Sequence, residues 1–222
     1  MKGIIFDFNG TLFYDTPKHI EAWREYSKRL RGTPFSDEEM EKHMLGHTND
    51  DIIAYAIGKK PEKAMAKKLA AEKEAVYRDM CRKDMENTKL VNGAAELLDF
   101  LVENSIPHTI ATASEINNVK FFIEVFNLPK WFDADKIVFD DGHMPNKPAP
   151  DIYLKAAKML NLAPEDCIVV EDAIAGIEAA KSAGIGKIIA IVPEEKRGFF
   201  ENYEGVSGVI SDFTEFDLTV FC

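Results

Sequence analysis

The sequence has little cysteine, and its cysteines form no recognisable pattern. The 222 residues include three of them, Cys81, Cys167 and Cys222, without the paired spacing of a zinc site. Such usage is typical of a reducing compartment. The sequence also lacks an apolar run of about 20 residues and a basic segment leading into an apolar one, so it predicts neither a membrane span nor a secretory leader. We therefore expect a cytoplasmic protein without a membrane partner.

Positive charge is scarce as well. The chain has 27 basic and 38 acidic residues, a net charge of −11, and no basic patch. Nucleic acid would be repelled, so we expect no nucleic-acid partner. Repeats and low-complexity segments are absent, and 46% of the residues are hydrophobic, as in soluble globular proteins. The length suits one large domain or a domain with an insertion, and we expect a monomer.

The pattern of apolar residues divides the chain into two kinds of segment. Residues 17–86 predict only helices, including one that starts at the capping box Ser36-Asp37-Glu38-Glu39 and ends near Leu45-Gly46. Short apolar strands alternate with helices elsewhere. The predicted strands are 4–6, 107–111, 136–139, 167–170, 187–192 and 208–210, and the predicted helices between them are 92–103, 116–126, 151–160 and 173–183. This alternation predicts an α/β fold, a Rossmann-like core of three layers with a mostly parallel sheet. We expect the core to comprise 1–14 and 88–222, with 15–87 as an inserted all-helical domain.

Polar residues follow several of the predicted strands. The first strand ends on Asp7, and Gly10-Thr11 then allows a sharp turn. A carboxylate at this end of a buried parallel strand lies where such sheets bind ligands, although Asp7 alone would more often cap a turn. Thr112 and Ser114 follow the strand 107–111 and precede a helix, where hydroxyls hold phosphoryl oxygens or simply cap the helix.

Two further segments carry charge. In Asn146-Lys147-Pro148-Ala149-Pro150 the prolines fix the direction of a lysine that would otherwise be an ordinary surface charge. Glu171-Asp172 ends another buried strand. Adjacent acids there repel each other unless a cation lies between them, and oxygen ligands suit Mg²⁺, but an acidic helix N-cap is the simpler alternative.

Together these four segments resemble the motifs of the haloacid dehalogenase superfamily, whose first motif is Asp-x-Asp-Gly-Thr-Leu. The resemblance covers essentially the whole chain. It implies that Asp7 is the nucleophile and that Asp7, the backbone carbonyl of Asn9, Asp172 and Glu171 hold Mg²⁺, with Glu171 binding directly or through water. It further implies phosphoryl or substrate binding by Thr112, Lys147, Gly10, Thr11, Ala113 and Ser114.

The helical insertion resembles the cap of the β-phosphoglucomutase and phosphoglycolate phosphatase branch. The resemblance implies substrate contacts from His19, Trp23, Gly46, His47 and Thr48, while packing within the helices is an equal alternative for His19 and Trp23. Mutase members tend to carry an Arg shortly after the glycine. This chain has His47-Thr48 there, which favours a phosphatase.

One residue departs from the family pattern. Asn9 stands where the family has its general acid and base, and an amide cannot exchange a proton as a carboxyl group does. Three hypotheses follow: Asn9 leaves a slow phosphatase, a group such as His19 or His47 supplies the proton, or Asn9 stands where the natural sequence has Asp.

The leading functional hypothesis is a magnesium-dependent phosphatase of small phosphorylated metabolites, most of all sugar phosphates. The alternatives are a phosphosugar mutase, a metal-free haloacid dehalogenase and a non-catalytic protein that binds phosphorylated metabolites. Glu171-Asp172 speaks against metal-free chemistry, which has no use for paired acids. Asn9 is the only support for a non-catalytic protein.

Overall fold

The structure is a computed structural model that describes residues 2–44 and 46–221. It consists of two compact units. The core unit comprises the residues up to Tyr14 and from Lys89 onward, and the cap unit comprises Asp15–Thr88. Leu45, near the predicted end of the second helix, and Cys222 lie outside the described residues.

The core unit contains a sheet of six strands, and every strand pair within the described residues is parallel. The strands are β1 (Gly3–Phe6), β2 (His108–Glu115), β3 (Val138–Asp140), β4 (Cys167–Glu171), β5 (Lys187–Ile191) and β6 (Gly208–Ile210). Their order is β3-β2-β1-β4-β5-β6, so the winding of the chain reverses at β1. Open parallel sheets bind ligands at the carboxyl ends of the strands at such a reversal. The predicted α/β fold is confirmed.

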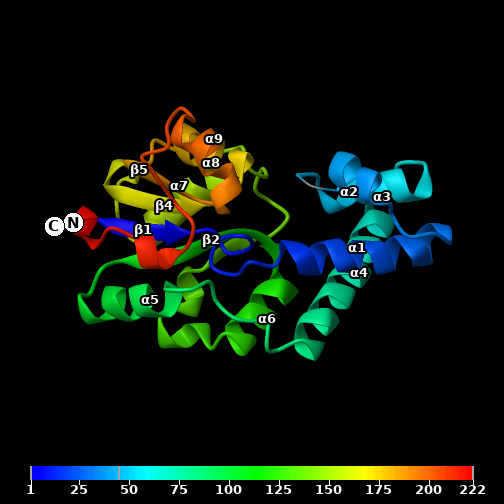
Figure 1. The fold of residues 1–222 in the computed structure, drawn as a ribbon, viewed down its shortest axis with the longest axis horizontal. Helices are drawn as coiled ribbons and strands as arrows, with labels where there is room; N and C mark the ends of the chain where they lie inside the picture. Colours follow the sequence, from blue (N-terminus) through cyan, green and yellow to red (C-terminus); the bar gives the residue numbers. More distant parts are fainter. Residues whose placement is uncertain (1, 45, 222) are drawn as a thin grey trace. The chain divides into compact units, whose positions relative to one another are not determined.

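Helices cover both faces of this sheet, as Figure 1 shows: α5 and α6 lie below it, and α7, α8 and α9 lie above it. Their bounds are α5 (Ala94–Glu103), α6 (Ile116–Val125), α7 (Asp151–Met159), α8 (Ile174–Ser182) and α9 (Glu194–Glu201). Because the strands run parallel, the chain returns along one face of the sheet between successive strands. The helices in these connections bury the strands on both faces. All four residues of β1 are buried.

The sequence patterns missed two features of the core unit. Helix α9 was not predicted, because it is mainly charged, contains Gly198 and buries only Phe200. Strand β2 was predicted to end at Ala111, but it continues to Glu115, which pairs with Asp140 of β3 after a shift in register. Thr112 and Ser114 therefore lie within the last residues of a strand rather than in a loop after it.

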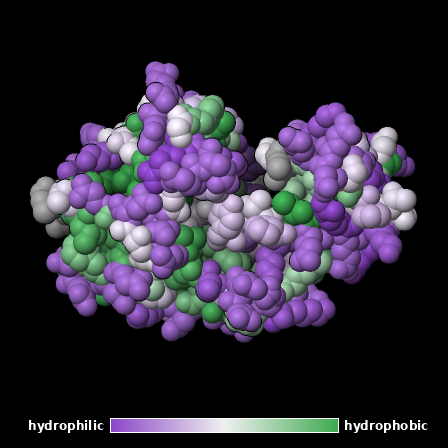
Figure 2. Space-filling model, in the orientation of Figure 1, coloured by the Kyte–Doolittle hydropathy of each residue, from purple (hydrophilic) through white to green (hydrophobic). Residues whose placement is uncertain are grey.

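The cap unit consists of helices α1 (Thr16–Arg31), α2 (Asp37–His43), α3 (Asn49–Ile57) and α4 (Lys63–Lys83). The predicted capping box is confirmed: the Ser36 hydroxyl accepts a hydrogen bond from the Glu39 amide, and the Glu39 carboxylate accepts one from the Ser36 amide. None of the helices in the described ranges combines the length and apolarity of a membrane span. On the face of the molecule shown in Figure 2, hydrophilic residues predominate and apolar residues form scattered groups.

Candidate active site

The turn after β1 holds Asp7 at the carboxyl edge of the sheet. The Asp7 amide donates to the Val170 carbonyl of β4 at 3.0 Å, and its side chain is buried. Phe8 stacks on Phe122 with ring centroids 4.3 Å apart, which anchors the turn on α6. Gly10 has a φ of +81°, and a Cβ atom there would lie 2.2 Å from a carboxylate oxygen of Asp172. Only glycine therefore allows the turn to approach Asp172 this closely.

Lys147 lies between two carboxylates, one in the turn after β1 and one at the end of β4. Its Nζ donates to Oδ1 of Asp7 at 2.7 Å and to Oε1 of Glu171 at 2.5 Å. Burial alone lowers the pKa of Lys147, but the negative charges of Asp7 and Glu171 outweigh burial and raise this pKa well above its usual value. Lys147 is therefore a fixed ammonium group beside Asp7.

The Glu171 carboxylate is surrounded by donors. Its Oε1 also accepts from the Tyr153 hydroxyl at 3.0 Å, and its Oε2 accepts from the amides of Asp172 and Ala173 at 2.8 and 2.9 Å. Helix α8 packs directly against this carboxylate, because a Cβ atom on Gly176 would lie only 1.6 Å from Oε1. Four hydrogen bonds thus hold this carboxylate in one orientation, with Lys147 as one of the donors.

Tyr153 was not predicted. It is completely buried in α7, and the Lys147 ammonium lies 5.0 Å from its ring centroid. Burial, followed by the charge of Glu171, raises the pKa of the Tyr153 hydroxyl well above its usual value, so this group is a hydrogen-bond donor. Its position after the Pro-Ala-Pro loop was the only signal in the sequence, and that position does not distinguish a donor to Glu171 from a packing aromatic residue.

Three carboxylates converge at this edge of the sheet. Asp7, Glu171 and Asp172 each offer an oxygen atom, and these atoms lie within 4.8 Å of one another. The Thr11 hydroxyl lies 3.4 Å from Oδ1 of Asp172. An all-oxygen set of carboxylates is the chemistry that Mg²⁺ prefers, so these residues fit the predicted metal.

Hydroxyl groups from the end of β2 face the turn. Ser114 Oγ donates to Oδ1 of Asn9 at 2.7 Å, and Thr112 Oγ1 lies 3.3 Å from the same oxygen. The Ser114 amide donates to Thr112 Oγ1 at 3.1 Å, and Ala113 between them is exposed. The Asn9 side chain therefore fixes the two predicted phosphoryl-binding hydroxyls relative to the turn after β1.

His19 and Trp23 make extensive contacts within the cap unit. The His19 ring stacks on Tyr77 at 4.0 Å, and its Nδ1 lies 2.7 Å from Nζ of Lys73. Burial lowers the pKa of Lys73, although Glu74 opposes the shift. Trp23 is buried, with the Lys73 ammonium 5.1 Å from its ring. Packing thus accounts for both residues, and their roles toward a substrate stay predictions.

The loop before α3 contains the other three predicted cap residues. Gly46 has a φ of +79° with open space around it, and His47 is exposed. Thr48 is the N-cap of α3, where its hydroxyl accepts from the amide of Asp51. Substrate contacts of Gly46, His47 and Thr48 also stay predictions.

The sequence profile of the haloacid dehalogenase-like hydrolases matches residues 1–184. The chain belongs to this family. The hydrolase is 31% identical to a phosphorylated carbohydrates phosphatase of Thermotoga maritima over 86% of each chain. It is 30% identical to a β-phosphoglucomutase of Bacillus subtilis, over 83% of this chain and 81% of that one. Among solved structures, a haloacid dehalogenase-like hydrolase (family IA, variant 3) of Entamoeba histolytica has 43% identity and a TM-score of 0.93, covering 99% of this chain and 96% of that one. These relatives place the hydrolase in the β-phosphoglucomutase-like branch.

Proposed function

We propose that this hydrolase is a magnesium-dependent phosphatase of small phosphorylated metabolites, above all sugar phosphates, and that it works through an aspartyl-phosphate on Asp7. The observation that carries the proposal is the Lys147 ammonium, which lies 2.7 Å from Asp7 beside the carboxylates of Glu171 and Asp172. Similarity to the phosphorylated carbohydrates phosphatase supports the substrate class.

In the first step a carboxylate oxygen of Asp7 attacks phosphorus and forms the acyl phosphate, while the bond from phosphorus to the ester oxygen breaks. Lys147 lowers the repulsion between the Asp7 carboxylate and the phosphoryl oxygens. The hydroxyls of Thr112 and Ser114, which donate to Asn9 in the free site, would turn to donate to those oxygens and hold them in line. In the second step water attacks the phosphorus and releases phosphate and the Asp7 carboxylate.

Mg²⁺ would be held by Asp7, Asp172 and the backbone carbonyl of Asn9, and when bound it would neutralise charge on the transferred phosphoryl group. Glu171 already accepts four hydrogen bonds. We therefore propose that it acts on the metal through water and on Lys147 directly.

Asn9 limits the first step, because its amide cannot protonate the departing oxygen. Alcohol leaving groups need that proton, whereas the carboxylate leaving group of an acyl phosphate does not. The enzyme should therefore hydrolyse acetyl phosphate faster than an alkyl phosphate ester.

The test is phosphate release from acetyl phosphate, para-nitrophenyl phosphate, phosphoglycolate and a panel of sugar phosphates, with Mg²⁺ and with chelator. The proposal expects turnover that requires Mg²⁺, is strongest on the good leaving groups and is abolished in Asp7→Asn. Absence of turnover on every compound would overturn it in favour of a non-catalytic protein. Equal turnover with chelator would overturn the metal dependence.

A mutase is the second candidate, because the hydrolase is 30% identical to β-phosphoglucomutase. A mutase returns the phosphoryl group from Asp7 to a sugar hydroxyl instead of water. Conversion of β-glucose 1-phosphate to glucose 6-phosphate, faster than phosphate release, would favour this activity over the phosphatase.

A further inference from the structure

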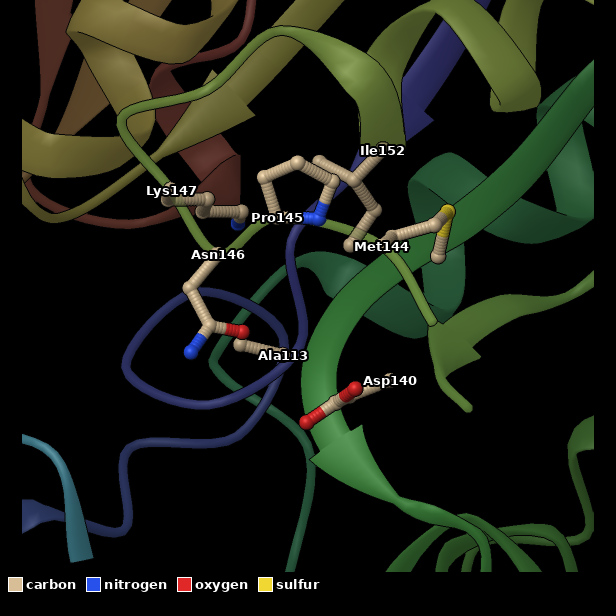
Figure 3. A pocket seen from close by; sticks show the side chains of 7 residues that line it. All are labelled: Ala113, Asp140, Met144, Pro145, Asn146, Lys147 and Ile152. Atoms are coloured by element: carbon tan, nitrogen blue, oxygen red, sulfur yellow. The ribbon is translucent and has the colours of Figure 1, made fainter. Parts of the chain in front are cut away.

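Lys147 reaches the site from the loop between β3 and α7, which Figure 3 shows from close by. The neighbouring loop residues do not hold its ammonium group, because Pro145 is apolar and the side-chain amide of Asn146 points away from it (Figure 3). Among the described residues, the ion pairs of Lys147 are those with Asp7 and Glu171. The position of the ammonium group therefore depends on the balance between these two carboxylates.

The Glu171 carboxylate is fixed from behind. Its Oε2 accepts hydrogen bonds from the amides of Asp172 and Ala173, so the carboxylate is not free to turn away from Lys147. Its Oε1 has two side-chain donors, the Lys147 ammonium at 2.5 Å and the Tyr153 hydroxyl at 3.0 Å. How strongly Oε1 attracts the ammonium thus depends on what else donates to that oxygen.

Tyr153 contacts both members of this ion pair. It lies in α7 with its side chain completely buried. Its hydroxyl donates to Glu171, and its ring centroid lies 5.0 Å from the Lys147 ammonium. The partial positive charge of the hydroxyl hydrogen offsets part of the negative charge that Oε1 presents to the ammonium, and burial enlarges this effect. The ring adds a weaker attraction for the ammonium.

We propose that Tyr153 is a positioning residue for Lys147: its hydrogen bond to Glu171 weakens the hold of that carboxylate on the ammonium and keeps the ammonium beside Asp7. Without the hydroxyl, Lys147 would be the one side-chain donor to Oε1 among the described residues, and Glu171 would draw it away from Asp7 and from a phosphoryl group bound there. The inference rests on the proposed phosphatase function and adds a residue that acts through Glu171 and Lys147 rather than on the substrate.

The test compares two tyrosines that each donate to a carboxylate. Tyr153→Phe removes the hydroxyl and keeps the ring. Tyr26→Phe is the matched control, because Tyr26 is a buried residue of the cap unit whose hydroxyl donates to Glu72 at 2.9 Å. Calorimetry gives the Kd of inorganic phosphate at saturating free Mg²⁺, which reports on the ammonium group without requiring turnover. Initial rates give kcat/KM for acetyl phosphate.

We expect Tyr153→Phe to weaken phosphate binding and to lower kcat/KM, each roughly three- to tenfold, because displacing a group that holds the reacting atoms by about 1 Å can cost roughly a hundredfold. Tyr26→Phe should leave both quantities unchanged, although both variants should be less stable in urea. Mg²⁺ should bind Tyr153→Phe at least as tightly as the unmodified enzyme, because Asp7 then shares less of its charge with Lys147.

Unchanged phosphate binding and kcat/KM in Tyr153→Phe would overturn the inference, because the hydroxyl would then serve stability alone. Equal losses in Tyr26→Phe would also overturn it, since both quantities would then follow stability. Weaker Mg²⁺ binding that matches the loss of phosphate binding would mean that the hydroxyl acts through the metal site instead of Lys147. Absence of acetyl phosphate hydrolysis by the unmodified enzyme would refute the proposed function, while phosphate binding would still test the position of Lys147.

Discussion

The substitution Asn9→Asp isolates proton transfer from the rest of the site. Oδ1 of Asn9 accepts from Ser114 Oγ at 2.7 Å and lies 3.3 Å from Thr112 Oγ1. An aspartate oxygen accepts the same two hydrogen bonds, so the hydroxyls should keep their positions. The change adds a carboxyl group that can protonate the leaving oxygen in the first step and deprotonate water in the second.

A positioned general acid or base contributes about 10²–10⁴-fold to a rate, which corresponds to roughly 3–5 kcal/mol of barrier. The added negative charge beside Asp7 and Asp172 offsets part of this gain, because it repels the incoming phosphate. We therefore expect kcat/KM for an alkyl ester such as glycerol 3-phosphate to rise at least about tenfold. This ratio reports the steps up to formation of the aspartyl-phosphate. It should therefore rise much less for acetyl phosphate, whose leaving group needs no proton.

Initial rates of phosphate release with both substrates at saturating Mg²⁺ test this reasoning. Asn202→Asp adds the same charge at an exposed position far along the chain and serves as the control. An unchanged kcat/KM for glycerol 3-phosphate in Asn9→Asp would refute the idea that proton transfer limits the enzyme. An equal rise for both substrates would point to altered phosphate binding instead.

Three further results are expected. In Tyr153→Phe the Glu171 carboxylate loses a donor at 3.0 Å, which should lower the free energy of unfolding in urea by about 1.5–3 kcal/mol and reduce kcat. In Gly176→Ala the new methyl group would lie 1.6 Å from Glu171 Oε1, and displacing that carboxylate from Lys147 should cost about 1–3 kcal/mol and most of the activity. The control Gly198→Ala, with open space around it, should stabilise its exposed helix by up to about 1 kcal/mol. Finally, Mg²⁺ at 100 times its Kd should stabilise the protein by about 2.7 kcal/mol, and a chelator should reverse this in thermal melts.

Much of the core could be predicted from the sequence, because buried parallel strands are short, apolar and separated by helices. The strand ends then brought Asp7 and the pair Glu171-Asp172 to the same edge of the sheet. Helix α9 escaped prediction because its charged residues and Gly198 give no apolar stripe. The extension of β2 to Glu115 depends on pairing with β3, which a local pattern does not contain.

The parts of the site that could not be predicted are the partners that hold the charged residues in place. Tyr153 is an ordinary aromatic residue of a helix until its hydroxyl is seen 3.0 Å from Glu171. Gly176 resembles any small helical residue until the approach of that carboxylate shows that no Cβ fits. Each of these depends on contacts between segments distant in sequence.

The charges of the site suggest what Asn9 contributes. The carboxylates of Asp7, Glu171 and Asp172 and the ammonium group of Lys147 together carry two net negative charges. Mg²⁺ would neutralise them, so a phosphate dianion would then enter a site without net charge. An ionised Asp at position 9 would add one more negative charge and weaken that binding. In the proposed phosphatase, Asn9 would thus exchange proton transfer for tighter binding of the phosphoryl group. If this is so, Asn9→Asp should raise KM together with kcat, and a lower KM would contradict the argument.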